Sequence, residues 1–198
     1  MIRRLKTKAS FFIIFTRMAG RDKILKIAIV GPESTGKSTL SRQLAEYYHT
    51  VWVPEYSREY CASLIGPATL QDELNIFSGQ LQTEDRLIKK ASNILICDTT
   101  ILTVKIWCDY LFKTTPQVVL NELKNRSYDF YLLMDIDLPW EDDPLRDFPH
   151  LRVYFLDIWK IELSALNASF KLISGNKEER FRNAINAVEQ LNSKKETL

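Results

Sequence analysis

Cysteine and histidine are scarce in this 198-residue sequence. It has three cysteines, Cys61, Cys97 and Cys108, and two histidines, His49 and His150. The cysteines lack both even pairing and metal-site spacing, and the histidines are too few and too scattered to supply ligands. The sequence thus argues against a disulfide framework and a thiolate or imidazole metal centre, and it predicts reduced thiols in a cytoplasmic protein.

Long hydrophobic runs are missing near the N-terminus. The apolar run at residues 11–15 follows several basic residues, but five residues are too few for a secretory core or a membrane span. We predict that residues 1–21 form a basic and apolar extension, poorly ordered and without stable membrane insertion. Met18 is an alternative start, and docking of this tail to a membrane or transporter stays an open alternative.

A strong excess of one charge is also absent. The sequence has 27 Lys and Arg against 25 Asp and Glu. Residues 1–26 carry eight basic residues and one acidic residue (+7), so the rest carries 19 basic and 24 acidic residues (−5). This mildly acidic body argues against a nucleic-acid partner. The length and the 45% apolar content suit one globular domain at residues 22–198.

Two of the six glycines bracket a phosphate-loop motif, G-x-x-x-x-G-K-[ST], at residues 31–38. An apolar, strand-like run precedes it and a helical pattern follows, which is the context that the motif requires. Backbone N–H groups of such a loop point at phosphates, and glycine lets the chain approach the anion closely. The alternative is a glycine-rich turn that binds nothing. The predicted ATP-phosphate-binding residues are Gly31, Glu33, Ser34, Thr35, Gly36, Lys37, Ser38 and Thr39.

Strand-like and helix-like runs alternate along the chain. This alternation predicts an α/β fold of the P-loop NTPase type, with three layers: a mostly parallel five-stranded sheet and helices on both faces. Thr69 and Thr115-Pro116 resemble helix starts. The strands are expected at residues 24–30, 50–53, 94–97, 128–134 and 170–174, and the helices at 37–48, 56–65, 70–91, 100–112, 116–126, 150–167 and 177–192.

Asp98 ends an apolar run and is the candidate metal ligand. A phosphate-loop enzyme places a carboxylate at this point to hold Mg²⁺, together with the hydroxyl of Ser38. The alternative is that Asp98 only caps the following helix.

Glu55 follows the second predicted strand and is the candidate base for an acceptor hydroxyl. Arg58 lies one helical turn further on, so we expect it near Glu55. The alternative is a surface Glu–Arg pair at the start of a helix.

A polar loop follows the fourth predicted strand and suits a lid. Arg146 in it is suited to the charge on a phosphoryl group in transfer, and Trp140 to stacking on an aromatic ring. Core packing of Trp140 and a solvated acidic turn are the alternatives. Gln80, on the apolar stripe of the long helix, needs a polar partner, which a substrate could supply.

Taken together, these residues resemble the ribosylnicotinamide kinase domain of NadR-type proteins, P-loop kinases of the AAA_28-like ATPase family. The resemblance extends over about residues 24–192. The phosphate loop alone is generic, whereas the other segments are more specific. The matching pieces are residues 31–40, Val53-Pro54-Glu55-Tyr56-Ser57-Arg58-Glu59-Tyr60, Gln80, Cys97-Asp98-Thr99, Tyr128-Asp129, Pro139-Trp140 and Asp143-x-x-Arg146.

The resemblance implies ATP- and Mg²⁺-dependent phosphorylation of the 5′-hydroxyl of nicotinamide riboside, giving nicotinamide mononucleotide. It implies that aromatic side chains hold the nicotinamide ring, with Trp140 matching one and Phe170 the other, where the family more often has tyrosine. Residues 175–180 would border adenine. Lys37, Glu55, Asp98 and Arg146 would be catalytic, and the substrate residues would be Glu55, Tyr56, Arg58, Gln80, Trp140, Asp143 and Phe170.

The sequence departs from the family pattern in places. Pro144 stands where the family usually has glycine, which predicts a stiffer lid. Asp98-Thr99-Thr100 replaces the commoner Asp-Thr-Asp. We expect neither an adenylyltransferase step nor a repressor role of this chain. Two other hypotheses stay open: a kinase of another nucleoside or nucleotide, and an ATP-binding regulatory module with weak hydrolysis. The oligomeric state is not indicated.

Overall fold

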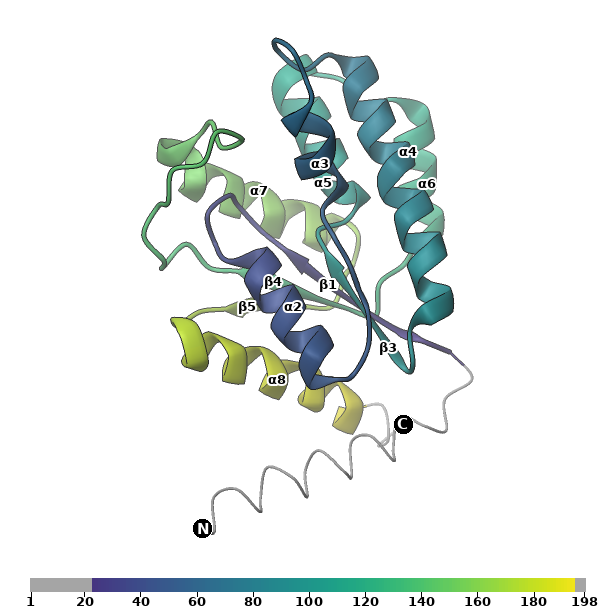
Figure 1. Ribbon diagram of the computed structural model, residues 1–198, viewed down its shortest axis with the longest axis vertical. Helices are drawn as coiled ribbons and strands as arrows, with labels where there is room; N and C mark the ends of the chain where they lie inside the picture. The colour runs from purple at the N-terminus through teal and green to yellow at the C-terminus, as the bar shows by residue number, and fades with distance from the viewer. Residues whose placement is uncertain (1–22, 195–198) are drawn as a thin grey trace.

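The computed structural model describes residues 23–194 of the chain (Figure 1). The predicted extension at residues 1–21 lies outside this part, so the domain boundary stays a prediction. The strands are β1 (Leu25–Val30), β2 (Trp52–Val53), β3 (Ile94–Asp98), β4 (Phe130–Met134) and β5 (Phe170–Ile173). The helices are α2 (Lys37–Tyr47), α3 (Tyr56–Ala62), α4 (Leu70–Leu87), η1 (Ile88–Lys90), α5 (Ile101–Trp107), η2 (Cys108–Phe112), α6 (Gln117–Asn125), η3 (Pro149–Leu151), α7 (Arg152–Ala165) and α8 (Lys177–Lys194).

The five strands form one parallel sheet in the order β2-β3-β1-β4-β5. The central strand β1 pairs with β3 on one side and β4 on the other. Strands β3 and β4 are buried at every position, as expected for strands covered on both faces. The predicted α/β class with a five-stranded sheet is confirmed, and the sheet is wholly parallel.

Helices cover both faces of the sheet and complete the predicted three layers (Figure 1). On one face, Leu40 and Leu44 of α2 and Val188 of α8 pack against the strands. On the other, Leu102 of α5 and Phe155 of α7 do so. A further group of helices, α3 to α6, packs together through its own apolar cluster. Within residues 23–194 no helix is both long and apolar enough to cross a membrane.

The helix starts show where local sequence decides the structure. Thr69 begins α4 as predicted, because its hydroxyl accepts from the Asp72 N–H and the Asp72 carboxylate accepts from the Thr69 N–H. Thr115 does not cap α6: Pro116 holds the N-cap position, and the Thr115 hydroxyl donates to Asp109 Oδ1 at 2.7 Å. The helix predicted at residues 100–112 is divided, since its last turn is the π-helix η2.

Candidate functional site

A large cleft opens at the carboxyl edge of the sheet, where parallel α/β folds bind ligands. Its volume is about 1910 Å³. Pockets for one small ligand usually measure about 300–1,000 Å³, so this cleft has room for two ligands. Its walls are the phosphate loop and the start of α2, the β2–α3 turn, one face of α4, the α5–η2 segment, the loop after β4 and the start of α8.

The two bracketing glycines are required by the backbone of the phosphate loop. Gly31 has φ 134°, and a Cβ there would lie 3.0 Å from the carbonyl oxygen of Met134. Gly36 has φ 79° and occupies the N-cap of α2, where no side chain caps the helix. The first N–H groups of α2 are therefore left to face an anion in the loop.

Side chains of the loop hold its shape. Lys37 Nζ donates to the carbonyl oxygens of Gly31 and Pro32 at 3.0 and 2.8 Å, so the ammonium lies across the loop. Thr35 Oγ1 donates to the Pro32 carbonyl at 2.8 Å. All eight predicted phosphate-binding residues, Thr39 at the exposed start of α2 included, line the cleft.

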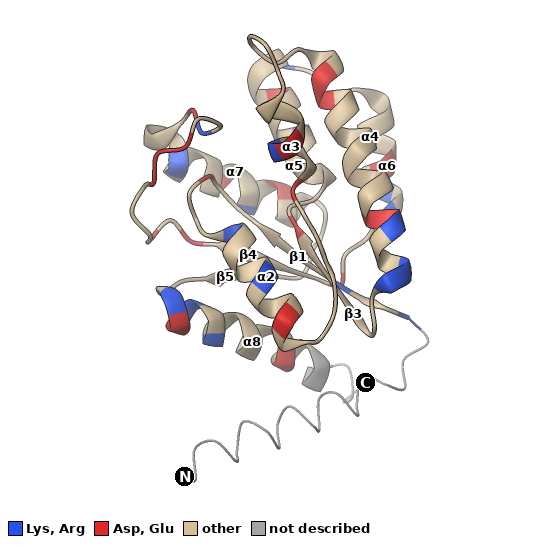
Figure 2. Cartoon of the chain, in the orientation of Figure 1, with Lys and Arg blue, Asp and Glu red and all other residues tan. Residues whose placement is uncertain are grey.

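The phosphate loop is joined to the loop that follows β4. Ser34 Oγ accepts from the Glu141 N–H at 2.8 Å and from Arg146 Nη1 at 3.3 Å. Glu33 accepts from the Phe148 N–H at 3.4 Å, and its partial burial raises the pKa of the Glu33 carboxyl. Figure 2 shows acidic and basic positions along the loop that follows β4. Arg146 thus lies beside the phosphate loop, and its role at the phosphoryl group stays a prediction.

Asp98 lies at the carboxyl end of β3 and is almost completely buried, at 2% exposure. Its Oδ1 has no hydrogen-bond partner. Burial, and next the Glu55 carboxylate, raise the pKa of Asp98 to about 6, against the opposing effects of Ser38 and Lys37. Asp98 does not cap α5, because Thr100 is the N-cap and its hydroxyl accepts from the Leu102 N–H at 3.3 Å.

These observations suit a divalent cation held by Ser38 and Asp98. A buried carboxylate oxygen without a partner is costly unless something binds it. The described residues contain no group of three or more His, Cys, Asp or Glu able to hold a metal alone. Magnesium does not require one, since it usually keeps several waters and takes further ligands from substrate phosphates.

Glu55 and Arg58 both line the cleft and lie near each other, but they do not form the surface ion pair that was the alternative. Glu55 precedes α3 and accepts from Ser57 Oγ at 3.1 Å. Arg58 instead crosses to Asp143, with Nη2 2.5 Å from Oδ2, and this contact is the main reason why the pKa of Arg58 is raised. The ion pair joins α3 to the loop after β4. Asp143 does not line the cleft itself but contacts Arg58, which does.

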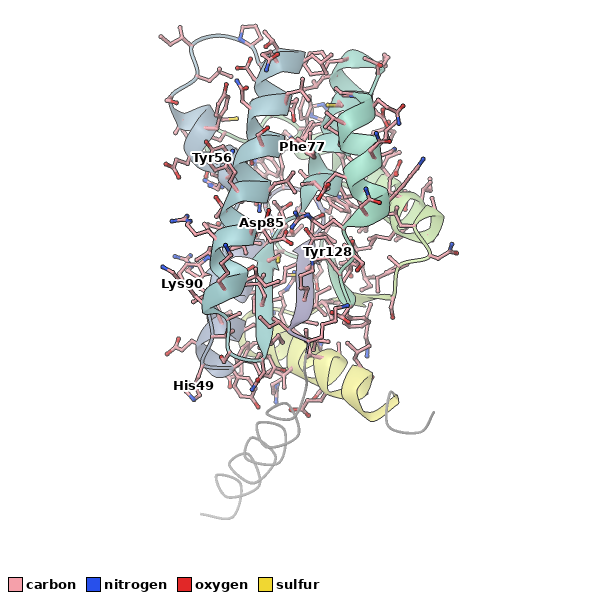
Figure 3. The ribbon with its side chains drawn as sticks, turned by 90° about the vertical axis from the view of Figure 1, so that its right-hand side faces the viewer. His49, Tyr56, Phe77, Asp85, Lys90 and Tyr128 are labelled. Carbon is pink, nitrogen blue, oxygen red and sulfur yellow. The ribbon has the colours of Figure 1, made fainter. Side chains whose placement is uncertain are left out.

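Gln80 has a backbone partner in place of the predicted substrate. Its Oε1 accepts from the Tyr56 N–H at 2.9 Å, and its Nε2 lies 3.5 Å from the Pro54 carbonyl oxygen. Tyr56 in turn packs on α4 at Gly79, where any Cβ would overlap its ring (Figure 3). Gln80 and Gly79 therefore position the turn that carries Glu55.

The structure places neither of the two predicted aromatic ring-binding residues in the cleft wall. Trp140 is half-buried, and its Nε1 donates to Asp142 Oδ1 at 2.8 Å. Phe170 begins β5 and packs in the core between the sheet and α7, so its predicted site role is wrong here. The reason is strand direction: the first residue of a parallel strand lies at the edge opposite to the phosphate loop.

Glu73 was missed by the sequence analysis, and Arg180 was included only as the end of the segment 175–180 that was expected to border adenine. Glu73 lies two helical turns before Gln80 on the same face of α4, and that spacing could have revealed it. Arg180 is buried at the start of α8, where Nη1 donates to the Thr35 carbonyl at 2.9 Å and Nη2 pairs with Asp137. No pattern in the sequence distinguishes Arg180 from the other charged residues around it.

Known proteins resemble the chain in sequence and in fold. It is 32% identical over 127 residues to the trifunctional NAD biosynthesis/regulator protein NadR of Escherichia coli (strain K12), an alignment that covers 61% of this chain and 30% of the relative. The crystal structure of a NadR protein in complex with NR superposes with a TM-score of 0.76 at 20% identity, covering 86% of this chain and 52% of that one. Thymidylate kinase from Ehrlichia chaffeensis gives 0.61 at 18% identity, covering 84% and 98%.

At these identities the solved structures establish the fold, that of the P-loop kinases. The chain spans less than a third of the curated relative and about half of the NadR structure. The family model for the AAA domain AAA_28 matches residues 26–180, well over half of the sequence. The chain therefore belongs to the AAA_28 family of AAA domains.

Proposed function

We propose that the protein is an ATP-dependent kinase that phosphorylates the 5′-hydroxyl of nicotinamide riboside to give nicotinamide mononucleotide. One observation carries the proposal: the phosphate loop, Asp98 and Glu55 converge on one cleft with room for two ligands. The sequence relationship to NadR, named for NAD biosynthesis, and the fold shared with a NadR protein bound to NR support this choice of acceptor.

The phosphate side of the cleft would bind ATP. Loop N–H groups and the start of α2 face the phosphates, and Lys37, lying across the loop, neutralises their charge. Ser38 and Asp98 would hold Mg²⁺, and the ion would supply positive charge that stabilises the charge of the phosphate groups. Arg146, held by Ser34, adds a positive charge where the transferring phosphoryl group becomes more negative.

The acceptor side of the cleft would orient the attacking hydroxyl. Glu55 stands close enough to Asp98 to raise its pKa, so the candidate base adjoins the phosphate end. Gln80 fixes the backbone next to Glu55, which limits the positions that the carboxylate can take. Such positioning is the main contribution of a protein to phosphoryl transfer.

The experiment that tests the proposal is ADP release from Mg·ATP in the presence of single acceptors. Nicotinamide riboside is compared with adenosine, cytidine, uridine and thymidine. We expect strong stimulation by nicotinamide riboside. Stimulation by another nucleoside, but not by nicotinamide riboside, would support the kinase mechanism and contradict the proposed acceptor. ADP release that no acceptor changes would favour the regulatory ATPase.

We also propose a cytoplasmic location, since Cys61, Cys97 and Cys108 are free thiols.

A further inference from the structure

Glu73, in the first turn of α4, is a buried carboxyl group that the mechanism above does not use. It lines the cleft and is only 6% exposed. Its side chain makes no hydrogen bond or ion pair with any residue between 23 and 194. Buried carboxylates are normally paired, because an unpaired one is costly to bury.

The surroundings of Glu73 are apolar or acidic. The thiols of Cys61 and Cys108 lie within electrostatic reach of the Glu73 carboxylate, and Ile76 lies one helical turn further along α4. Burial, and to a smaller extent the Asp72 carboxylate, raise the pKa of Glu73 to about 7. No lysine or arginine among the described residues counters this shift. The fold thus provides an acidic position without its own cation.

The place of Glu73 along α4 relates it to the acceptor. Glu73 precedes Gln80 by seven residues, which is about 10 Å along the same face of the helix. Gln80 holds the turn that carries Glu55, the candidate base at the reacting hydroxyl. A nucleoside whose 5′-hydroxyl lies at Glu55 is long enough to bring its base towards Glu73.

We propose that Glu73 determines acceptor specificity by placing a negative charge beside the base, so that the cleft selects a nucleoside with a cationic ring. The inference rests on the proposed function, because nicotinamide riboside carries a positive charge on its pyridinium ring. Charge complementarity in a buried site acts strongly, since little water screens it. A neutral nucleoside gains no such attraction from the Glu73 carboxylate and is not otherwise repelled by it.

The test compares two acceptors of nearly the same size and shape that differ in ring charge: nicotinamide riboside and its neutral 1,4-dihydro form. We expect Glu73→Gln to lower kcat/KM for nicotinamide riboside by about tenfold or more, from the loss of one buried charge pair. For the dihydro form the change should stay within about twofold, and the KM for ATP should not move. Glu73→Asp, which retains the charge, should retain the preference. Glu46→Gln, on the exposed side of α2, is the matched control.

The outcomes separate this inference from the function on which it rests. A wild-type enzyme that phosphorylates no pyridine nucleoside overturns the proposed function and, with it, this inference. A wild-type enzyme that uses nicotinamide riboside, combined with equal effects of Glu73→Gln on both acceptors, overturns the role of Glu73 alone. A loss confined to the cationic acceptor supports the role. Thermal unfolding of each variant verifies that the proteins compared are folded. If Glu73→Gln does not fold, Glu73→Asp is compared with the wild type instead.

Discussion

At the scale of single residues, the buried carboxyl of Asp98 is the most informative group at the phosphate end of the cleft. We predict that Asp98→Asn lowers kcat at least about 100-fold, because the amide removes the negative charge that would hold the metal. Kinetics over a wide range of Mg²⁺ concentration check this. The nearly isosteric amide should leave the fold intact. An unchanged kcat and an unchanged Mg²⁺ dependence would remove Asp98 from the metal site.

Glu73 gives a second prediction, on stability rather than rate. Burial raises its pKa from 4.5 to about 7, so the folded state binds the proton more tightly than the unfolded chain. The stability from this proton is fully present below pH 4.5 and is lost as the pH rises through about 7.

The comparison of wild type with Glu73→Gln isolates this contribution from other titrating groups. Between pH 4.5 and 8, the unfolding free energy of the wild type should fall relative to that of Glu73→Gln by at most about 3 kcal/mol. Urea unfolding of both proteins at several pH values measures it. A difference that stays constant with pH would mean that Glu73 titrates normally.

At the scale of elements, the contact between α3 and α4 sets the position of the candidate base. Gly79 lies inside α4, where glycine is normally about 0.5–1 kcal/mol less stable than alanine. Here a Cβ would overlap the Tyr56 ring. We predict that Gly79→Ala displaces the Glu55 turn, lowering kcat/KM for the acceptor about tenfold or more with little change in the KM for ATP. Steady-state kinetics with each substrate varied test this, and equal changes for both substrates would contradict it.

Local patterns in the sequence were sufficient to predict most elements and the phosphate loop. The motif at residues 31–38 and the apolar strands depend only on residues that are neighbours in the sequence. They can therefore be predicted from local sequence patterns. The start of α4 at Thr69 follows from its capping residues in the same way.

Contacts between distant segments were not predictable in this way. Arg58 pairs with Asp143, 85 residues away, and Gln80 bonds to the backbone of Tyr56, and neither contact was predicted. Phe170 was correctly placed at the start of the fifth strand, but its match to a ring-binding residue came from the family resemblance and not from its position in the strand. Each outcome depends on how elements are packed, which hydrophobic periodicity does not specify.

At the scale of the whole molecule, a buried ionic cluster joins elements away from the cleft. Glu84 of α4 is 1% exposed and contacts Lys26 of β1 at 3.1 Å, Arg126 at 3.0 Å and the Tyr128 hydroxyl at 2.6 Å. Arg126 also pairs with the exposed Asp85 at 2.9 Å. Figure 3 shows Asp85 and Tyr128 on this side of the molecule.

The cluster provides a prediction with a built-in control. Glu84→Gln should lower the unfolding free energy by about 3 kcal/mol or more, because two partly buried cations lose their common partner. Asp85→Asn, at the exposed side of the same arginine, should cost less than about 1 kcal/mol. Chemical denaturation compares them. Similar losses of unfolding free energy in both variants would mean that the burial of Glu84 does not increase its contribution to stability.

The central claim is that this cleft transfers the γ-phosphoryl group of ATP to a nucleoside hydroxyl. The most direct measurement is ³¹P NMR of the products formed from Mg·ATP and nicotinamide riboside, with Lys37→Ala as the inactive reference. We predict one new resonance of a 5′-phosphomonoester, formed in equal amount to ADP, and its loss in the variant. ADP with only inorganic phosphate, or no reaction of the wild-type protein, would contradict the account.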